Sequence, residues 1–209
     1  MDELTLKTFV AGELYNNCYL IFSEKSKKGF IVDSPAPSRE LDEYIQNQDL
    51  EIIFIALTHA HFDHIASLDN YSTPFYIHKD DLSFLRDPNL NGSAFFSSSV
   101  IIKRRPYFYQ DGQLLRFGEH NIEVIHSPGH TPGSVSLKLN DWLFSGDTIF
   151  LDSVGRTDIP LASHDTIIES IKNRILTLPP ETLIYPGHGP LTTVEREKKH
   201  NPFLESKEI

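Results

Sequence analysis

Runs of apolar residues in the first half of the chain predict β-strands. Residues 52–57 form a continuous run rich in β-branched side chains, which is typical of a strand buried on both faces of a sheet. Two shorter runs, 18–22 and 30–32, flank a polar segment and predict a β-hairpin. Residues 75–77 predict a further strand.

The second half shows alternation rather than continuous runs. Apolar and polar positions alternate over 121–124 and 134–139, which predicts strands with one buried face. Asn140 and Asp141 form a predicted turn into a strand at 142–144, and 183–185 predicts a last short strand.

Helical spacing occurs near both ends of the chain. Apolar residues at this spacing follow Ser38 and predict a short helix that the serine caps. A second helix is predicted over 167–175, where isoleucines recur until a Pro-Pro pair ends it. A short helix is predicted over 80–86, and the poorly patterned segment 87–106 is expected to be loop-rich with a helical piece. The pattern as a whole predicts an α/β sandwich.

The length and the net charge of the chain limit the classes of protein to which it could belong. A chain of 209 residues with 39% hydrophobic residues fits one domain, so residues 1–209 are expected to fold as a single unit. The formal net charge of −10 argues against a surface that binds nucleic acid or an anionic membrane as a whole. We therefore expect neither as a partner.

The number of cysteines and the N-terminal sequence indicate the cellular compartment. The chain has one cysteine, Cys18, which cannot form an internal disulfide and is expected to pack in an apolar strand. The first residues lack the pattern of a signal peptide, and no stretch approaches the roughly 20 apolar residues of a membrane span. A cytoplasmic location is expected.

Metal-binding residue types cluster directly after the predicted strand 52–57. His59, His61, Asp63 and His64 fall within six residues, before a helix expected to start near Ile65. His59 and His61 point the same way if the backbone stays extended between them. Imidazole and carboxylate together suit zinc, iron or manganese rather than calcium. The cluster therefore predicts a metal site.

Three more residues of these types stand at predicted strand ends. His130, Asp147 and His188 each lie in a loop beside glycine, and His130 and His188 also have proline nearby. Glycine and proline fix loop shape and allow close approach of the backbone. Loops at strand ends are where α/β scaffolds place functional side chains.

The motif His-x-His-x-Asp-His, followed in order by an isolated His, Asp and His, resembles the metallo-β-lactamase superfamily. The resemblance covers nearly the whole chain and implies a four-layer αββα sandwich with two metal ions. It implies the following ligands: His59, His61 and His130 for the first ion, Asp63, His64 and His188 for the second, and Asp147 bridging both.

A finer resemblance points to one branch of that superfamily. The segments 146–150, 155–158, 17–21 and 201–203 are similar to glyoxalase II (hydroxyacylglutathione hydrolase), most of all to its short bacterial relatives. Only 21 residues follow His188, too few for the helical region that contacts glutathione in full-length glyoxalase II. The resemblance implies a thioester hydrolase that acts on acyl-glutathione or a related small acyl-thiol, and the short segment after His188 leaves the choice between these two open.

The ligand set also implies a mechanism. Two divalent ions, expected to be zinc with iron or manganese as alternatives, would lower the pKa of a shared water from about 15.7 to roughly 7. The resulting hydroxide would attack a thioester carbonyl, with Asp63 orienting it. Arg156 is expected to contact the substrate, although an ion pair with Asp158 is an equal alternative. The basic run at 103–105 is expected to be solvated surface.

Two other functions stay open at this point. One is a persulfide dioxygenase with a single iron, whose family shares the Gly-Arg-Thr-Asp segment at 155–158. That family has alanine before the last histidine and aspartate after it, where this chain has Gly187 and Gly189. The other is a nucleic-acid-processing member of the superfamily, which the acidic charge disfavours. The remaining histidines are expected not to be ligands, with His126 a candidate for a supporting role: His78, His120, His126, His164 and His200.

Overall fold

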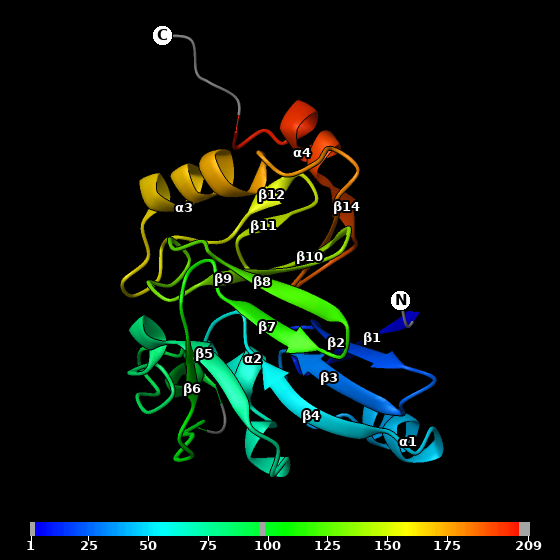
Figure 1. Cartoon of the computed structure of the whole chain (residues 1–209). Helices are drawn as coiled ribbons and strands as arrows, with labels where there is room; N and C mark the ends of the chain where they lie inside the picture. Colours follow the sequence, from blue (N-terminus) through cyan, green and yellow to red (C-terminus); the bar gives the residue numbers. More distant parts are fainter. Residues whose placement is uncertain (1–2, 97–98, 205–209) are drawn as a thin grey trace, which may run out of the picture. The chain divides into compact units, whose positions relative to one another are not determined.

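A computed structural model describes residues 3–96 and 99–204 of the chain. The chain divides into two compact units, Met1–Tyr109 and Gln110–Ile209. Each unit contains one six-stranded β-sheet (Figure 1). The prediction of one domain over residues 1–209 stays a prediction.

The sheet of the first unit follows the order of the chain, β1-β2-β3-β4-β5-β6. Its first three strands are antiparallel, whereas β3, β4, β5 and β6 run parallel to one another. The strands are β1 (Leu4–Ala11), β2 (Asn16–Ser23), β3 (Lys28–Val32), β4 (Glu51–Ala56), β5 (Phe75–His78) and β6 (Tyr107–Tyr109). The predicted hairpin is β2 and β3, and the predicted strand 52–57 is β4.

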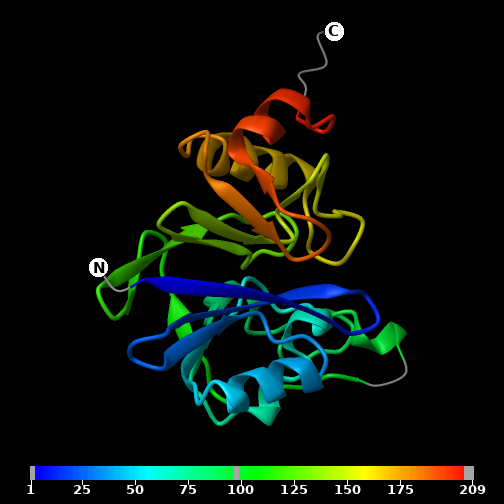
Figure 2. The same cartoon turned by 90° about the vertical axis from the view of Figure 1, so that its right-hand side faces the viewer.

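Helix α1 (Arg39–Asn47) covers one face of this sheet (Figure 2). Ser38 caps it as predicted, because the Ser38 hydroxyl accepts a hydrogen bond from the N–H of Leu41 at 3.3 Å. Leu41 is buried with the apolar side chains of β2 and β4, and Cys18 lies fully buried in the same core. The expectation that Cys18 packs in a strand is confirmed.

Two helix predictions in the first unit are wrong in detail. The helix expected to start near Ile65 instead ends there, since α2 spans Phe62–Ile65 and begins directly after His61. The helix expected over 80–86 is a 3₁₀ turn, η2 (Lys79–Asp81), followed by further turns whose backbone bonds run mostly three residues apart. Asp81 is fully buried there, although an amphipathic helix would expose it. Two other 3₁₀ turns are η1 (Leu68–Asn70) and η3 (Ser93–Phe95), the second being the helical piece expected within 87–106.

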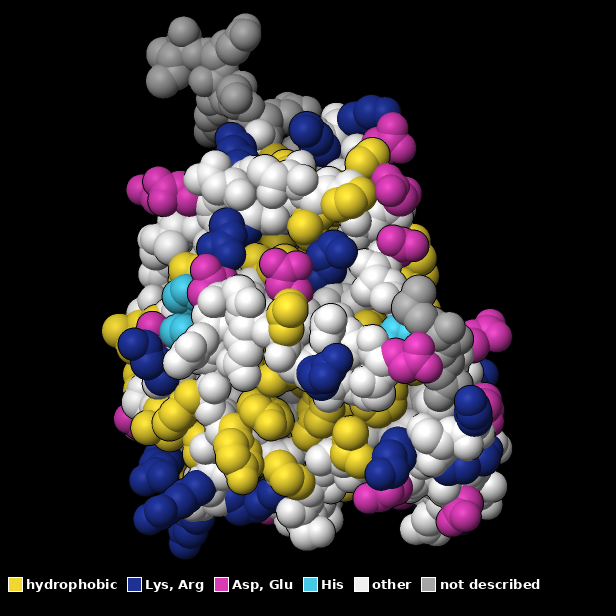
Figure 3. Space-filling view, in the orientation of Figure 1, with side chains coloured by type: hydrophobic (Ala, Val, Ile, Leu, Met, Phe, Trp, Pro, Cys, Tyr) yellow, Lys and Arg dark blue, Asp and Glu magenta, His cyan; other side chains and the backbone are white. Residues whose placement is uncertain are grey.

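The basic run at 103–105 is only partly surface. Arg104 donates hydrogen bonds to the carbonyl oxygens of Leu68 at 2.9 Å and Tyr71 at 2.6 Å, and also to that of Thr73. Its guanidinium therefore links three carbonyl oxygens of the segment that leads into β5. Directly after the run, Tyr107 and Phe108 on the edge strand β6 are exposed, and hydrophobic side chains gather over β4, β5 and β6 in Figure 3.

The sheet of the second unit has the order β14-β13-β10-β9-β8-β7. Only β10 and β13 are parallel, and the other neighbours are antiparallel. The strands are β7 (Leu114–Phe117), β8 (His120–His126), β9 (Val135–Leu139), β10 (Trp142–Gly146), β13 (Leu183–Pro186) and β14 (Thr192–Thr193). A two-stranded hairpin, β11 (Ile149–Phe150) and β12 (Ser153–Val154), follows β10.

Helices pack on one face of this second sheet as well (Figure 2). Helix α3 (His164–Ser170) continues into a π-helical turn, η4 (Ile171–Ile175), and together they cover the predicted helix 167–175. Their isoleucines join a core with β8, β10 and β13. Helix α4 (Val194–His200) closes the described part of the unit. The α/β class is thus confirmed, with each unit supplying a sheet and the helices that cover it.

No helix within residues 3–96 and 99–204 combines the length and the apolar character needed to cross a bilayer.

Candidate metal centre

The histidine cluster of the first unit follows the buried end of β4. Because β3 and β4 are parallel, Asp33 at the end of β3 lies beside Thr58 at the end of β4. The Asp33 carboxylate accepts hydrogen bonds from the Thr58 backbone N–H at 2.7 Å and from its hydroxyl at 2.8 Å. The start of the histidine segment is therefore held by a buried carboxylate.

The same carboxylate orients His64. Asp33 Oδ2 lies 2.8 Å from Nδ1 of His64, and both side chains are buried. Since a carboxylate only accepts, Nδ1 carries the proton and Nε2 keeps its lone pair for another partner. A carboxylate behind the ring is the usual arrangement of a metal-binding histidine.

Two further side chains stand at Nε2 of His64. Asp63 Oδ2 lies 3.8 Å away, and Nδ2 of the buried Asn16 lies 2.7 Å away. The Oδ1 atom of Asn16 is buried and has no hydrogen-bond partner among the residues that the structure describes. In this structure the Asn16 amide therefore donates to Nε2 of His64, the nitrogen that would bind a metal, and the Asp63 carboxylate lies beside it.

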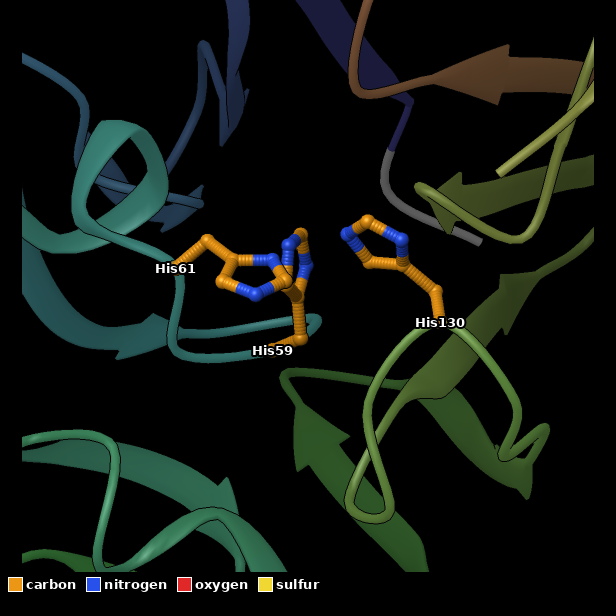
Figure 4. Close-up of side chains that lie close together, drawn as sticks. All are labelled: His59, His61 and His130. Atoms are coloured by element: carbon orange, nitrogen blue, oxygen red, sulfur yellow. The ribbon is translucent and has the colours of Figure 1, made fainter. Parts of the chain in front are cut away.

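His59 and His61 bring their rings together, as expected for an extended backbone. Their centroids lie 4.9 Å apart, and the rings of His59 and His64 lie 4.0 Å apart. Figure 4 shows both imidazoles projecting from the loop after β4. The hydroxyl of Thr58 lies 3.1 Å from Nδ1 of His59. The loop after β4 and helix α2 therefore group three imidazoles.

The second unit holds its own group, made by three loops. Asp147 follows β10 and His188 follows β13, and these parallel neighbours end at the same edge of the sheet. Asp147 Oδ2 lies 3.5 Å from Nε2 of His130 and 3.6 Å from Nε2 of His188. The carboxylate therefore stands between two imidazoles that face it with the same ring nitrogen.

His130 is oriented by the backbone. Its Nδ1 donates to the carbonyl oxygen of Arg156 at 2.9 Å, which leaves Nε2 for another partner. It lies in the loop between β8 and β9, from which its ring projects in Figure 4. His126, at the end of β8, lies 3.0 Å from the carbonyl oxygen of Pro132 in the same loop.

Two glycines allow this packing. A Cβ on Gly129, whose φ is +138°, would lie 2.4 Å from the backbone of Ile167. A Cβ on Gly155 would lie 1.8 Å from the carbonyl oxygen of Asp147. Both distances are far below any van der Waals contact, so only glycine fits at either position.

Arg156 faces an acid. Its guanidinium donates to both carboxylate oxygens of Asp158, at 2.8 and 2.9 Å. The hydrogen bonds to Arg156 lower the pKa of Asp158, and both side chains are largely exposed. The ion pair weighed as an alternative is thus present, while the guanidinium stays accessible to solvent.

Cys18 does not serve as a nucleophile. Its thiol is fully buried, donates to the carbonyl oxygen of Asp33 at 3.2 Å, and has its pKa raised by that burial.

The donors present fit divalent metal ions. His and Asp side chains in the described part of the chain include sets that could hold an ion. At His64 and His130, the partner at Nδ1 makes Nε2 the ring nitrogen that would bind an ion, and at His64 the ion would replace the Asn16 amide there. The sequence pattern missed Asp33, Asn16 and Asp81, although Asp33 follows an apolar run just as the histidine cluster does.

Comparisons with known proteins identify the family of the chain. The family model of the metallo-β-lactamase superfamily matches residues 11–188. The hydroxyacylglutathione hydrolase GloC of Haemophilus influenzae is 32% identical, over 91% of this chain and 93% of that protein.

Two solved structures are similar over nearly the whole chain. The BLEG-1 B3 metallo-β-lactamase has a TM-score of 0.90 and 37% identity, covering 97% of this chain and 100% of that one. TTHA1623, solved in a di-iron-bound form, has a TM-score of 0.83 and 34% identity, covering 95% and 100%. Together with the αβ units and the His/Asp groups, these matches show that the chain belongs to the metallo-β-lactamase superfamily.

Proposed function

We propose that the protein is a thioester hydrolase that uses two divalent metal ions and cleaves acyl-glutathione or a related small acyl-thiol in the cytoplasm. The observation that carries this proposal is Asp147, whose Oδ2 stands within 3.6 Å of Nε2 of both His130 and His188. A carboxylate placed between imidazoles suits the role of a bridge between two ions.

The proposed ligands are those that the family motif implies. One ion would be held by His59, His61 and His130, the second by Asp63, His64 and His188, with Asp147 shared. The ion count is supported by the di-iron form of TTHA1623 and the substrate class by the similarity to GloC. We propose zinc, with iron or manganese as alternatives.

When bound, the ions would supply a water of lowered pKa and polarise the substrate carbonyl. The residues of the chain do the rest. Asp33 and the Arg156 carbonyl hold His64 and His130 in the required tautomer. The carboxylate of Asp63 would orient the attacking water. A thiolate leaves readily near neutral pH, so no further acid is required for the departing group.

Metal analysis and a hydrolysis assay test the proposal together. We expect the purified protein to contain close to two divalent ions per chain and to hydrolyse S-lactoylglutathione. A chelator should abolish this activity and added metal should restore it.

Other outcomes would contradict the proposal in distinct ways. A single iron with oxygen consumption on glutathione persulfide, and no hydrolysis, would identify a persulfide dioxygenase instead. The similarity to BLEG-1 makes β-lactam hydrolysis the second candidate. A β-lactam cleaved with higher kcat/KM than any thioester would replace the proposed substrate class.

Arg156→Ala tests the proposed substrate contact. An anionic carboxylate of the substrate would take the place of Asp158 on the exposed guanidinium. We expect KM to rise about 3- to 10-fold with kcat nearly unchanged, as for the loss of one solvent-exposed charged contact worth roughly 1 kcal/mol. The Arg156 carbonyl that holds His130 stays in place. Arg174→Ala, which breaks an ion pair with Asp111, is the matched control. An unchanged KM in Arg156→Ala would remove this residue from the site.

A further inference from the structure

A buried carboxylate that belongs to no proposed ligand set lies beside the His59 and His61 segment. Asp81, in the 3₁₀ turn η2, is fully buried. Its Oδ2 accepts a hydrogen bond from the backbone N–H of Ala60 at 3.0 Å. Ala60 is itself fully buried and joins the two histidines. A buried carboxylate is costly unless hydrogen bonds offset the loss of water, so its position needs a reason.

The backbone around Ala60 suggests the reason. The N–H groups of alternate residues are all bound: Thr58 to the Asp33 carboxylate, Ala60 to Asp81, and Phe62 to the carbonyl oxygen of Asn91 at 3.0 Å. The partners come from three separate segments, at the end of β3, in η2 after β5, and at Asn91. Together they fix the backbone between the end of β4 and the start of α2.

The backbone conformation of this segment decides where the imidazoles lie. In an extended chain, side chains two residues apart lie on the same side, so His59 and His61 come together only while the peptides between them keep this conformation. Their ring centroids lie 4.9 Å apart, and Figure 4 shows the two rings next to each other. The bond from Ala60 to Asp81 is the middle one of the three anchors. It acts on the His59–Ala60 peptide, the first of the two peptides between the histidines.

We propose that Asp81 is a positioning residue: through the N–H of Ala60 it holds His59 and His61 at the separation needed to bind one metal ion together. This inference rests on the proposed function, because it takes both histidines as ligands. The hydrogen bond, rather than the negative charge, is the feature that matters. Asp81→Asn keeps an acceptor oxygen for Ala60, whereas Asp81→Ala removes it.

The test measures metal affinity on metal-free protein by competition with a chromophoric chelator. Asp81→Ala should weaken binding of one of the two ions about 10- to 100-fold, the usual effect of removing an outer partner of a metal ligand. Asp81→Asn should stay within about threefold of the wild type. Asp69→Ala, which removes an exposed acid in the 3₁₀ turn η1 of the same unit, is the control and should bind both ions normally. Circular dichroism establishes that each variant is folded.

The outcomes separate this inference from the proposed function. If the wild type binds no metal, the proposed function fails. If it binds two ions and Asp81→Ala binds both equally well, only the positioning role is overturned. An Asp81→Asn variant as weak as the alanine variant would show that the charge acts, which also overturns it. Should Asp81→Ala fail to fold, the asparagine variant decides: wild-type affinity and an unchanged cobalt absorption spectrum support positioning by the hydrogen bond.

Discussion

Asp147→Ala is expected to lose both metal ions and at least about 100-fold in kcat/KM on a thioester substrate. The reason is geometric, because one oxygen of this carboxylate lies 3.5 Å from His130 and 3.6 Å from His188. Removing a partner in the outer shell of a metal ligand already costs about 10- to 100-fold in affinity or activity, and a shared ligand should cost more. Metal content after gel filtration and steady-state kinetics measure the two effects.

Asp141→Asn is the matched control for that experiment. Asp141 is an exposed acid at the other end of β10, in the turn that enters the strand. Its substitution should leave metal content and kcat/KM unchanged. Retention of two ions by Asp147→Ala would show that this carboxylate is not a shared ligand, whatever happens to the activity.

Gly155→Ala is expected to have the second largest effect, this time on folding as well as on metal binding. The added methyl group would lie 1.8 Å from the Asp147 carbonyl oxygen, so one of the two backbone segments must move. Overpacking of side chains costs about 1–3 kcal/mol, and a clash with backbone has fewer ways to relax. We expect a loss of at least about 3 kcal/mol in the free energy of unfolding, measured with urea on metal-free protein.

Gly118→Ala separates the clash from the loss of a glycine as such. Gly118 has a φ of +58°, and a Cβ there would meet nothing within 4 Å. This variant should cost only the left-handed backbone strain, about 1–2 kcal/mol. If the free energy of unfolding of Gly155→Ala is no lower than that of Gly118→Ala, the close approach of Gly155 to Asp147 does not affect stability.

The sequence predicted the strands that carry the site, because their apolar runs are long or strictly alternating. The run at 52–57 became β4 (Glu51–Ala56), and the histidines follow its end. Strands of two or three residues, such as β6, β11 and β14, are too short to show a pattern. The helix placed over 80–86 failed because Asp81 is buried for a contact with Ala60, a partner 21 residues away that helical spacing cannot reveal.

The sequence likewise revealed some residues of the candidate site and not others. A cluster such as His59, His61 and His64 is visible because its members are close in sequence. Their supporting groups are not, since Asp33 reaches His64 across 31 residues and Asn16 across 48. Such contacts arise from the pairing of strands, and local spacing contains no trace of them.

The burial of Cys18 gives the protein an internal indicator of its own unfolding. This is the only thiol in the chain, and it is fully buried with its pKa raised. A disulfide-exchange dye reacts with the thiolate, so the native protein should not react with it. During thioester cleavage the dye would then count product thiol alone. In denaturant it would count one thiol per chain, so one reagent follows both turnover and the fraction of unfolded molecules.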